Sequence, residues 1–205
     1  MKLYYCDVLA PRKVCAALKM VLKLPVDYVY VDLGKGENRK PPYKAINPNG
    51  KVPTLVDGER VITEADTILC YLSDKAGADL WPSDKQRQFD VMSWFSWNAQ
   101  HFLRATGSLY FEYVIKDRYK LGAADPAEVE QALAEFRRCG KLLNAHLKDR
   151  KWLVGDRLSA ADISVAVTLP YAAKAHMPID EFPEMRRWHD QLCAMDGWLD
   201  PFPQR

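Results

Sequence analysis

The stretch that decides the fold reads Asn47-Pro48-Asn49-Gly50-Lys51-Val52-Pro53-Thr54-Leu55, and Glu64-Ala65-Asp66 follows shortly after it. This order predicts a turn, a strand entered through a proline, a hairpin at Asp57-Gly58 and a helix that opens on acidic residues. Because X–Pro bonds tolerate the cis form far better than other peptide bonds, Val52–Pro53 is a candidate cis peptide. A cis bond would turn the N–H and C=O of Val52 outward, where they could pair with an extended peptide ligand.

The chain before this stretch predicts a β-α-β unit. Residues 2–5 are aromatic and β-prone, apolar residues recur at helical spacing from Pro11 to 24, and residues 27–33 alternate in polarity. The two strands of such a unit run parallel and are joined by a right-handed crossover.

The chain after the stretch adds two antiparallel strands, at 52–56 and 60–62, and a helix that ends near Ala76. Thr63 is the expected N-cap of this helix, with Asp66 as its capping-box partner. The order of elements predicts an α/β thioredoxin-like domain with a mixed four-stranded sheet.

The second half of the chain shows helical patterns and no convincing strand. Residues 86–120 predict one long helix, or a helix with a bend at Gly107. Further helix starts are indicated at Asp125-Pro126 and at Ser159, whose capping-box partner is Asp162. We therefore expect a thioredoxin-like domain at 1–77, a linker at 78–85 and an all-α helical bundle domain at 86–205.

Composition excludes several classes of protein. The chain has 205 residues, 48% of them hydrophobic, and a net charge of +2, which lacks the basic footprint of an obligate nucleic-acid binder. Five cysteines without CxxC spacing suggest neither a disulfide framework nor a metal site, and they fit the reducing cytoplasm. No apolar run approaches the roughly 18–20 residues needed to span a bilayer, so no membrane partner is expected.

Three motifs carry a resemblance that extends over essentially the whole chain. They are Asn47-Pro-Asn-Gly-Lys-Val-Pro-Thr-Leu55, Glu64-Ala-Asp-Thr-Ile-Leu-Cys-Tyr-Leu72 and Leu153-Val-Gly-Asp-Arg-Leu-Ser-Ala-Ala-Asp-Ile163. In this order and at this spacing they resemble the cytosolic glutathione transferases. We expect a bacterial-type member of that superfamily, without assigning a class.

The resemblance implies a binding site for glutathione as co-substrate, with no metal. Val52, next to Pro53, would bind the cysteinyl part through its backbone, and Glu64 and Ala65 would hold the γ-glutamyl end. A carboxylate at a helix N-terminus agrees with this, because free N–H groups and the helix dipole favour an anion there. Lys51 could meet the glycyl carboxylate. Ala65 departs from the family pattern, which has Ser at this position, so a hydroxyl donor is lost.

The residue that activates the thiol is less clearly indicated. A free thiol has a pKa of about 8.5, so the protein must supply a donor or positive potential. The family places a Tyr, Ser or Cys near the first strand, and the candidates here are Tyr5 and Cys6. Otherwise the thiolate is held by backbone N–H groups at the helix that follows, helped by Arg12 or Lys13.

A second wall of the site is expected from the long helix. Trp97, His101, Arg104 and Ser108 recur on one helical face, and Leu9 precedes the first helix. We take Leu9, Trp97, His101 and Arg104 as candidates for the electrophile site, although each could instead serve packing or the surface.

The resemblance thus implies a homodimeric transferase for detoxification, which conjugates glutathione to apolar electrophiles, and we expect it in the cytoplasm. The alternatives are a glutathione-dependent thiol oxidoreductase using Cys6 and a non-catalytic binding protein of the same fold.

Overall fold

The computed structural model describes residues 1–204, which divide into two compact units. The first contains Met1–Trp81 together with the tail from Asp196 onward, and the second contains Pro82–Met195. The sequence had assigned the tail to the second domain, whereas its contacts group it with the first. Each unit is described by itself below.

A four-stranded mixed sheet forms the centre of the first unit, with strand order β2-β1-β3-β4. The strands are β1 (Lys2–Tyr5), β2 (Asp27–Tyr30), β3 (Thr54–Asp57) and β4 (Arg60–Thr63). β1 pairs parallel with β2 and antiparallel with β3, and β3 and β4 form the expected hairpin. The predicted thioredoxin-like sheet is therefore confirmed, although β2 ends three residues earlier than expected and β3 begins at Thr54 instead of Val52.

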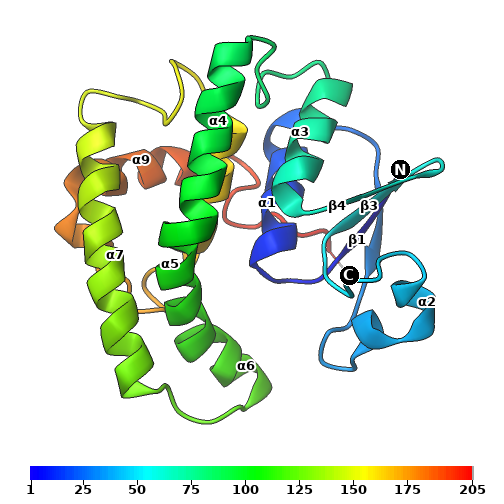
Figure 1. The fold of residues 1–205 in the computed structure, drawn as a ribbon, viewed down its shortest axis with the longest axis horizontal. Coiled ribbons are helices and arrows are strands. Elements are labelled where there is room, and N and C mark those ends of the chain that lie inside the picture. Colours follow the sequence, from blue (N-terminus) through cyan, green and yellow to red (C-terminus); the bar gives the residue numbers. More distant parts are fainter. Residues whose placement is uncertain (205) are drawn as a thin grey trace. The chain divides into compact units, whose positions relative to one another are not determined.

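Three α-helices accompany the sheet: α1 (Leu9–Ala17), which continues as a π-helical turn over Leu18–Leu22, α2 (Pro41–Lys44), which follows a 3-10 turn at Glu37–Arg39, and α3 (Ala65–Lys75). Figure 1 shows α1 and α3 on one side of the sheet and α2 on the other. Alternation along β1 agrees with this arrangement, because Leu3 is fully buried whereas the ring of Tyr4 packs edge-on against Tyr43 of α2.

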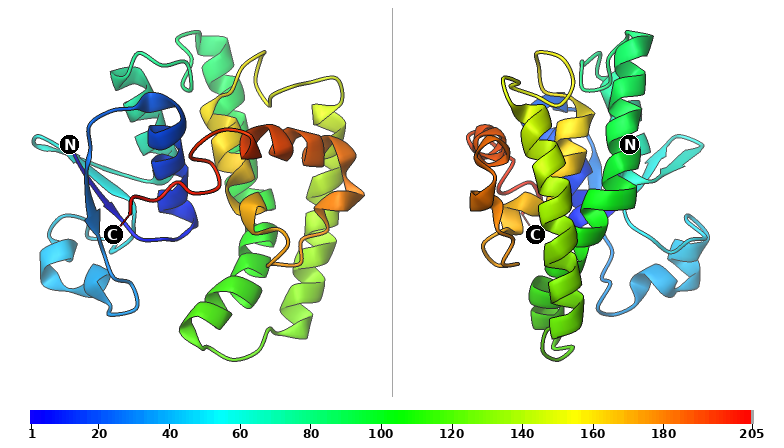
Figure 2. Two further views of the ribbon diagram at one scale, coloured as in Figure 1. Left: turned by 180° about the vertical axis from the view of Figure 1, so that it is seen from behind. Right: turned by 60° about the vertical axis from the view of Figure 1, so that its left-hand side comes forward.

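The tail from Asp196 packs against α1 and the sheet. The guanidinium of Arg12 donates to the carbonyl of Trp198 and lies 5.5 Å from the centre of its ring, and Trp198 is fully buried. Phe202 stacks on Tyr5 with ring centroids 6.2 Å apart. Figure 2 shows the tail, in red, running across α1. These contacts explain why the tail belongs to the first unit.

The second unit is helical, and no residue of 82–195 lies in a strand. Its first helical stretch combines α4 (Lys85–Trp97), α5 (Leu103–Tyr110) and α6 (Lys116–Tyr119). These segments are joined by π-helical turns at Asn98–Phe102 and Phe111–Ile115, so the irregularities flank Gly107 rather than coincide with it. At the first turn, buried Asn98 donates to the carbonyl of Ser164, 2.9 Å away.

The remaining helices of the second unit are α7 (Pro126–Leu147), α8 (Ala160–Val165) and α9 (Pro183–Cys193). Both helix starts expected here are confirmed, because the Asp125 side chain caps α7 and Ser159 forms a capping box with Asp162. Asp162 is fully buried and also accepts from the indole Nε1 of Trp188 at 2.9 Å, which ties α8 to α9.

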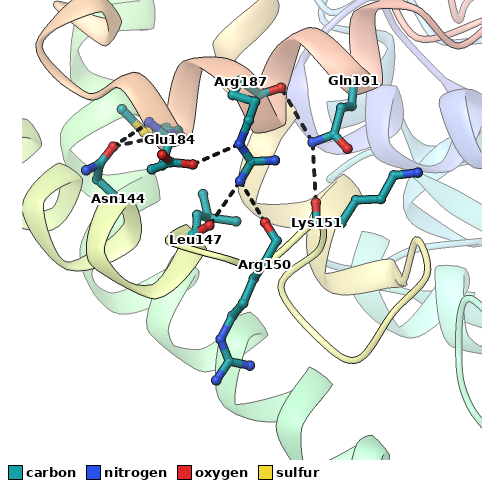
Figure 3. Close-up of polar contacts among 8 residues, drawn as sticks. Asn144, Leu147, Arg150, Lys151, Glu184, Arg187 and Gln191 are labelled. Carbon is teal, nitrogen blue, oxygen red and sulfur yellow. Dashed lines mark hydrogen bonds and ion pairs between the residues drawn. The ribbon is translucent and has the colours of Figure 1, made fainter.

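Helices α7 and α9 cap one another (Figure 3). The Asn144 Oδ1 atom accepts from the backbone N–H of Glu184, 2.8 Å away in the first turn of α9. In return, the Arg187 guanidinium donates to the carbonyls of Leu147 at 2.9 Å and Arg150 at 2.7 Å, at the end of α7. Backbone groups that lack partners at helix ends are thereby satisfied.

Candidate functional site

The segment between α2 and β3 carries the first part of the candidate site. The Val52–Pro53 peptide bond is cis, as the sequence suggested. Val52 is buried and packs in a cluster with Cys6, Val31 and Tyr43, whereas the neighbouring Lys51 is exposed. The side chain of Val52 thus anchors this segment.

The start of α3 carries the second part. Glu64 is the N-cap residue, it is exposed, and its backbone has φ 66° and ψ 119°. A non-glycine residue in this region is strained, and such strain is concentrated at functional sites. Ala65 is buried at the first helical position, and the Glu64 side chain makes no capping hydrogen bond. The N-terminus of a helix is a favourable place for an anion.

The prediction that Thr63 and Asp66 cap α3 is wrong. Thr63 is the last residue of β4 and does not cap the helix, because Glu64 occupies the N-cap position. Asp66 does not complete a capping box either. Its carboxylate instead accepts from Lys13 Nζ at 2.8 and 3.0 Å and so ties α3 to α1.

The two catalytic candidates lie in the interior of the first unit. Tyr5 is 2% exposed, and its ring packs against Tyr28, Tyr30 and Phe202. Cys6 is 1% exposed, and its Sγ lies 3.4 Å from the hydroxyl of Tyr30. Their assignment as catalytic residues stays a prediction, and their burial gives it no support.

Arg12 and Lys13, the cations expected to stabilise the thiolate, interact with other groups. Arg12 donates to the tail, and Lys13 is paired with Asp66. The N-terminus of α1 follows Val8, whose side chain makes no capping hydrogen bond, and the first turn contains no acidic residue. The first backbone N–H groups of α1 belong to Leu9 and Ala10, because Pro11 has none.

Three members of the expected electrophile face share a cavity within the second unit. His101, Arg104 and Ser108 line a cavity of about 410 Å³, whose other wall includes Glu128 and Glu135 of α7. Its lining is polar and charged, which differs from the apolar lining expected for this face.

Trp97 does not line this cavity. Its ring stacks on Phe102 at 5.6 Å and meets Trp94 edge-on at 5.1 Å, which is the packing alternative recognised from the sequence.

Sequence reasoning missed three residues that contact the candidate site. Tyr43, Asn47 and Thr54 are buried, and each places a polar side-chain atom within 3.4 Å of the carbonyl oxygen of Lys51, next to Val52. Asn47 and Thr54 lie inside the opening motif, but their side-chain partners depend on a fold that the motif alone does not show. Among residues 1–204, no group of three or more His, Cys, Asp or Glu side chains is arranged to hold a metal ion.

Comparison with known proteins gives a consistent result. Family models described as the N-terminal and C-terminal domains of glutathione S-transferase match residues 9–80 and 126–191. The chain is 30% identical over 178 residues to glutathione S-transferase 3 of Zea mays, covering 83% of this chain and 79% of that protein.

Solved structures show the same fold. A glutathione transferase from Populus trichocarpa superposes with a TM-score of 0.89 at 22% identity, covering 98% of this chain and 96% of that one. A glutathione transferase homolog from Lodderomyces elongisporus, described with two glutathione molecules per subunit, gives 0.83 at 21% identity, covering 98% and 96%. In the part of the chain that the structure describes, no helix is long and apolar enough to cross a membrane.

Proposed function

This chain belongs to the glutathione S-transferase superfamily, and we propose that it binds glutathione and transfers the glutathione thiolate to small electrophiles. One observation carries the proposal: buried Val52 precedes cis Pro53 in the same unit that holds Glu64 at positive φ at the start of α3. Both features fall within the stretch that matches the N-terminal-domain model.

Each part of glutathione has a proposed partner in the first unit. The cysteinyl N–H and C=O pair with the backbone of Val52, as one strand pairs with another. The γ-glutamyl carboxylate binds at the N-terminus of α3, at the N–H of Ala65, because unsatisfied N–H groups and the helix dipole favour an anion there. The Glu64 carboxylate accepts from the α-amino group, and the exposed Lys51 ammonium meets the glycyl carboxylate.

We assign thiolate stabilisation to the backbone N–H groups of the first turn of α1. The burial of Tyr5 and Cys6, together with the engagement of Arg12 and Lys13, favours this alternative over a side-chain donor. A thiol near the N-terminus of a helix has a lowered pKa. The thiol proton passes to solvent, and sulfur then bonds to the electrophilic carbon, from which the leaving group departs with the bonding electrons.

His101 and Arg104, which line a polar cavity of the second unit, stay candidates for the electrophile site. Trp97 and Leu9 stay candidates for this site.

A non-catalytic glutathione-binding protein is the second candidate function. The observation that favours it is the burial of both side chains expected to activate the thiol. The oxidoreductase alternative requires Cys6 to form a mixed disulfide with glutathione, for which a thiol 1% exposed is poorly placed. The homodimer, the cytoplasmic location, the bacterial type and a part in detoxification stay predictions from the sequence.

Calorimetric titration with glutathione, followed by assay of turnover with a dinitrophenyl halide, tests the proposal. Glu64→Ala should raise the Kd for glutathione about tenfold, because a charged hydrogen bond is lost. The matched control is Glu59→Ala, which changes an exposed glutamate in the turn of the β3–β4 hairpin and should leave the Kd unchanged.

The outcomes separate the candidate functions. Failure of the unaltered protein to bind glutathione would refute the proposed function, and firm binding without turnover would favour the binding protein. A large loss of turnover in Tyr5→Phe or Cys6→Ala, with glutathione affinity retained, would refute the assignment of thiolate stabilisation to the backbone.

A further inference from the structure

The carbonyl of Lys51 is surrounded by a buried group of three polar side chains, and it accepts hydrogen bonds from Tyr43 and Asn47. The Tyr43 hydroxyl lies 2.6 Å from it, Asn47 Nδ2 lies 2.9 Å away, and Thr54 Oγ1 lies 3.4 Å away. Tyr43, Asn47 and Thr54 are 6%, 2% and 0% exposed. We call these three residues the Lys51 clamp.

The donors and acceptors of the Lys51 clamp match. The Lys51 carbonyl cannot donate, so the single hydroxyl hydrogen of Tyr43 is donated to it. The Tyr43 oxygen therefore accepts the hydroxyl hydrogen of Thr54 in the 2.9 Å contact between them. The Asn47 Oδ1 atom accepts from the N–H of Asn49 at 3.1 Å, which orients the amide. Asn47 Nδ2 then donates one hydrogen to the Lys51 carbonyl and the other to Thr54 Oγ1, each at 2.9 Å. Fully satisfied buried networks of this kind are rigid.

Fixing the Lys51 carbonyl also fixes the direction of the Val52 N–H. The C=O of Lys51 and the N–H of Val52 belong to one planar peptide unit, and the Lys51–Val52 bond is trans, because Val52–Pro53 is the one cis bond among residues 1–204. In a trans peptide the C=O and N–H point in opposite directions. When the Lys51 clamp draws the carbonyl inward, the N–H of Val52 must face away from the clamp.

We propose that Tyr43, Asn47 and Thr54 are positioning residues that aim the backbone N–H of Val52 at glutathione. This inference rests on the proposed function, since it takes glutathione as the ligand of Val52. The clamp contacts no part of that ligand, and it acts through the orientation of one peptide plane. Because the orientation exists before binding, the protein does not have to order this peptide when glutathione arrives.

Other contacts keep the path of the loop without the clamp. Asn38 Nδ2 donates to the carbonyl of Gly50 at 2.8 Å, and Lys44 Nζ donates to that of Pro48 at 2.7 Å. Removing the Tyr43 hydroxyl should therefore release the peptide plane while the loop and the packing of the Tyr43 ring against Tyr4 persist.

The test compares Tyr43→Phe with Tyr71→Phe. The Tyr71 hydroxyl donates to Asp57 Oδ2 at 2.7 Å, so each change removes one hydrogen bond donated by a part-buried tyrosine hydroxyl of the same unit, and Tyr43→Phe also removes the acceptor of the Thr54 hydroxyl. Titration calorimetry well below the melting temperature should show a Kd for glutathione raised about tenfold in Tyr43→Phe, the size expected for one misaligned hydrogen bond. Tyr71→Phe should stay within about twofold, although both variants lose thermal stability.

A second pair of variants and a measurement without ligand complete the test. Thr54→Ser keeps the hydroxyl and should retain affinity, whereas Thr54→Val should weaken it as Tyr43→Phe does. In the free protein, the NMR cross-peak of the Val52 amide should move in Tyr43→Phe and stay in place in Tyr71→Phe.

The outcomes distinguish this inference from the proposed function. If the unaltered protein binds no glutathione, the proposed function fails, and the Val52 cross-peak still tests the clamp. An unmoved cross-peak in Tyr43→Phe, or equal losses of affinity in Tyr43→Phe and Tyr71→Phe, would overturn the inference.

Discussion

The buried carboxylate of Asp162 allows a quantitative test of how the second unit is held together. Asp162 Oδ1 accepts from the backbone N–H of Leu153 and from the indole Nε1 of Trp188, both at 2.9 Å. Its Oδ2 accepts from the N–H of Ser159 at 2.9 Å and from the Ser159 hydroxyl at 2.8 Å. One side chain thus joins the loop before α8, the N-terminus of α8 and α9.

Removing this carboxylate should cost a large part of the free energy of unfolding. Asp162→Ala leaves three buried N–H groups without an acceptor, while the Ser159 hydroxyl can turn elsewhere. Each orphaned donor costs about 1 to 3 kcal/mol. Burial disfavours the charged form of Asp162 and so raises its pKa, and removing the carboxylate relieves this cost. We therefore take the low end of the range for each orphaned donor. The sum is about 3 kcal/mol.

Asp162→Asn should cost less, because the amide can keep its oxygen toward Leu153 and Trp188. The amide nitrogen then faces Ser159, whose hydroxyl can accept from it but whose N–H cannot. One orphaned donor remains, which predicts a loss of about 1 to 2 kcal/mol.

Urea unfolding followed by circular dichroism and by tryptophan fluorescence measures these losses. Asp156→Asn, an exposed position in the same loop, is the control and should change the free energy of unfolding by less than about 0.5 kcal/mol. Equal losses in Asp162→Ala and Asp162→Asn, or a loss below about 1 kcal/mol in Asp162→Ala, would refute the hydrogen-bond reasoning.

Two further predictions concern the second unit. A Cβ at Gly140 would lie 2.7 Å from Phe182 Cε2, so Gly140→Ala should lower the melting temperature. A Cβ at Gly107 would have its nearest neighbour at 4.0 Å, so Gly107→Ala should raise the melting temperature, because Ala favours a helix. A melting temperature raised by both changes would contradict the packing at Gly140. Burial by itself would raise the pKa of Glu112, but hydrogen bonds from Lys116 and from a backbone N–H outweigh it and hold the pKa below its ordinary value. A lowered carboxyl pKa stabilises the folded state above the unfolded-state pKa of about 4.3, and this stability is lost as pH falls through the folded-state pKa. Stability measured against pH should therefore fall less steeply below about 4.3 in Glu112→Gln, and an unchanged profile would count against this ion pair.

Local signals in the sequence were sufficient where structure depends on near neighbours. Asp57-Gly58 predicted its hairpin, Ser159 and Asp162 predicted their capping box, and Pro126 marked the start of α7. In each case the interacting groups lie within a few residues of one another, so spacing alone identifies them. The mixed sheet followed from the order of such elements.

Tertiary structure decided the features whose partners are distant in sequence. Asp66 has the spacing of a capping residue, but Lys13 is near enough in space to take its carboxylate, and the helix begins at a strained Glu64 instead. The π-helical turn before α5 contains Asn98, which reaches Ser164 on another helix. Neither pairing leaves a periodic trace in the sequence.

The opening motif shows both kinds of determination. Its sequence alone indicated a possible cis bond at Val52–Pro53 and an outward-facing backbone at Val52. The tertiary structure added Tyr43, which comes from α2, and brought the side chains of Asn47 and Thr54 together with it beside the Lys51 carbonyl. The physical reason is that a planar peptide needs only local covalent geometry, whereas its orientation requires buried donors that only the folded chain brings together.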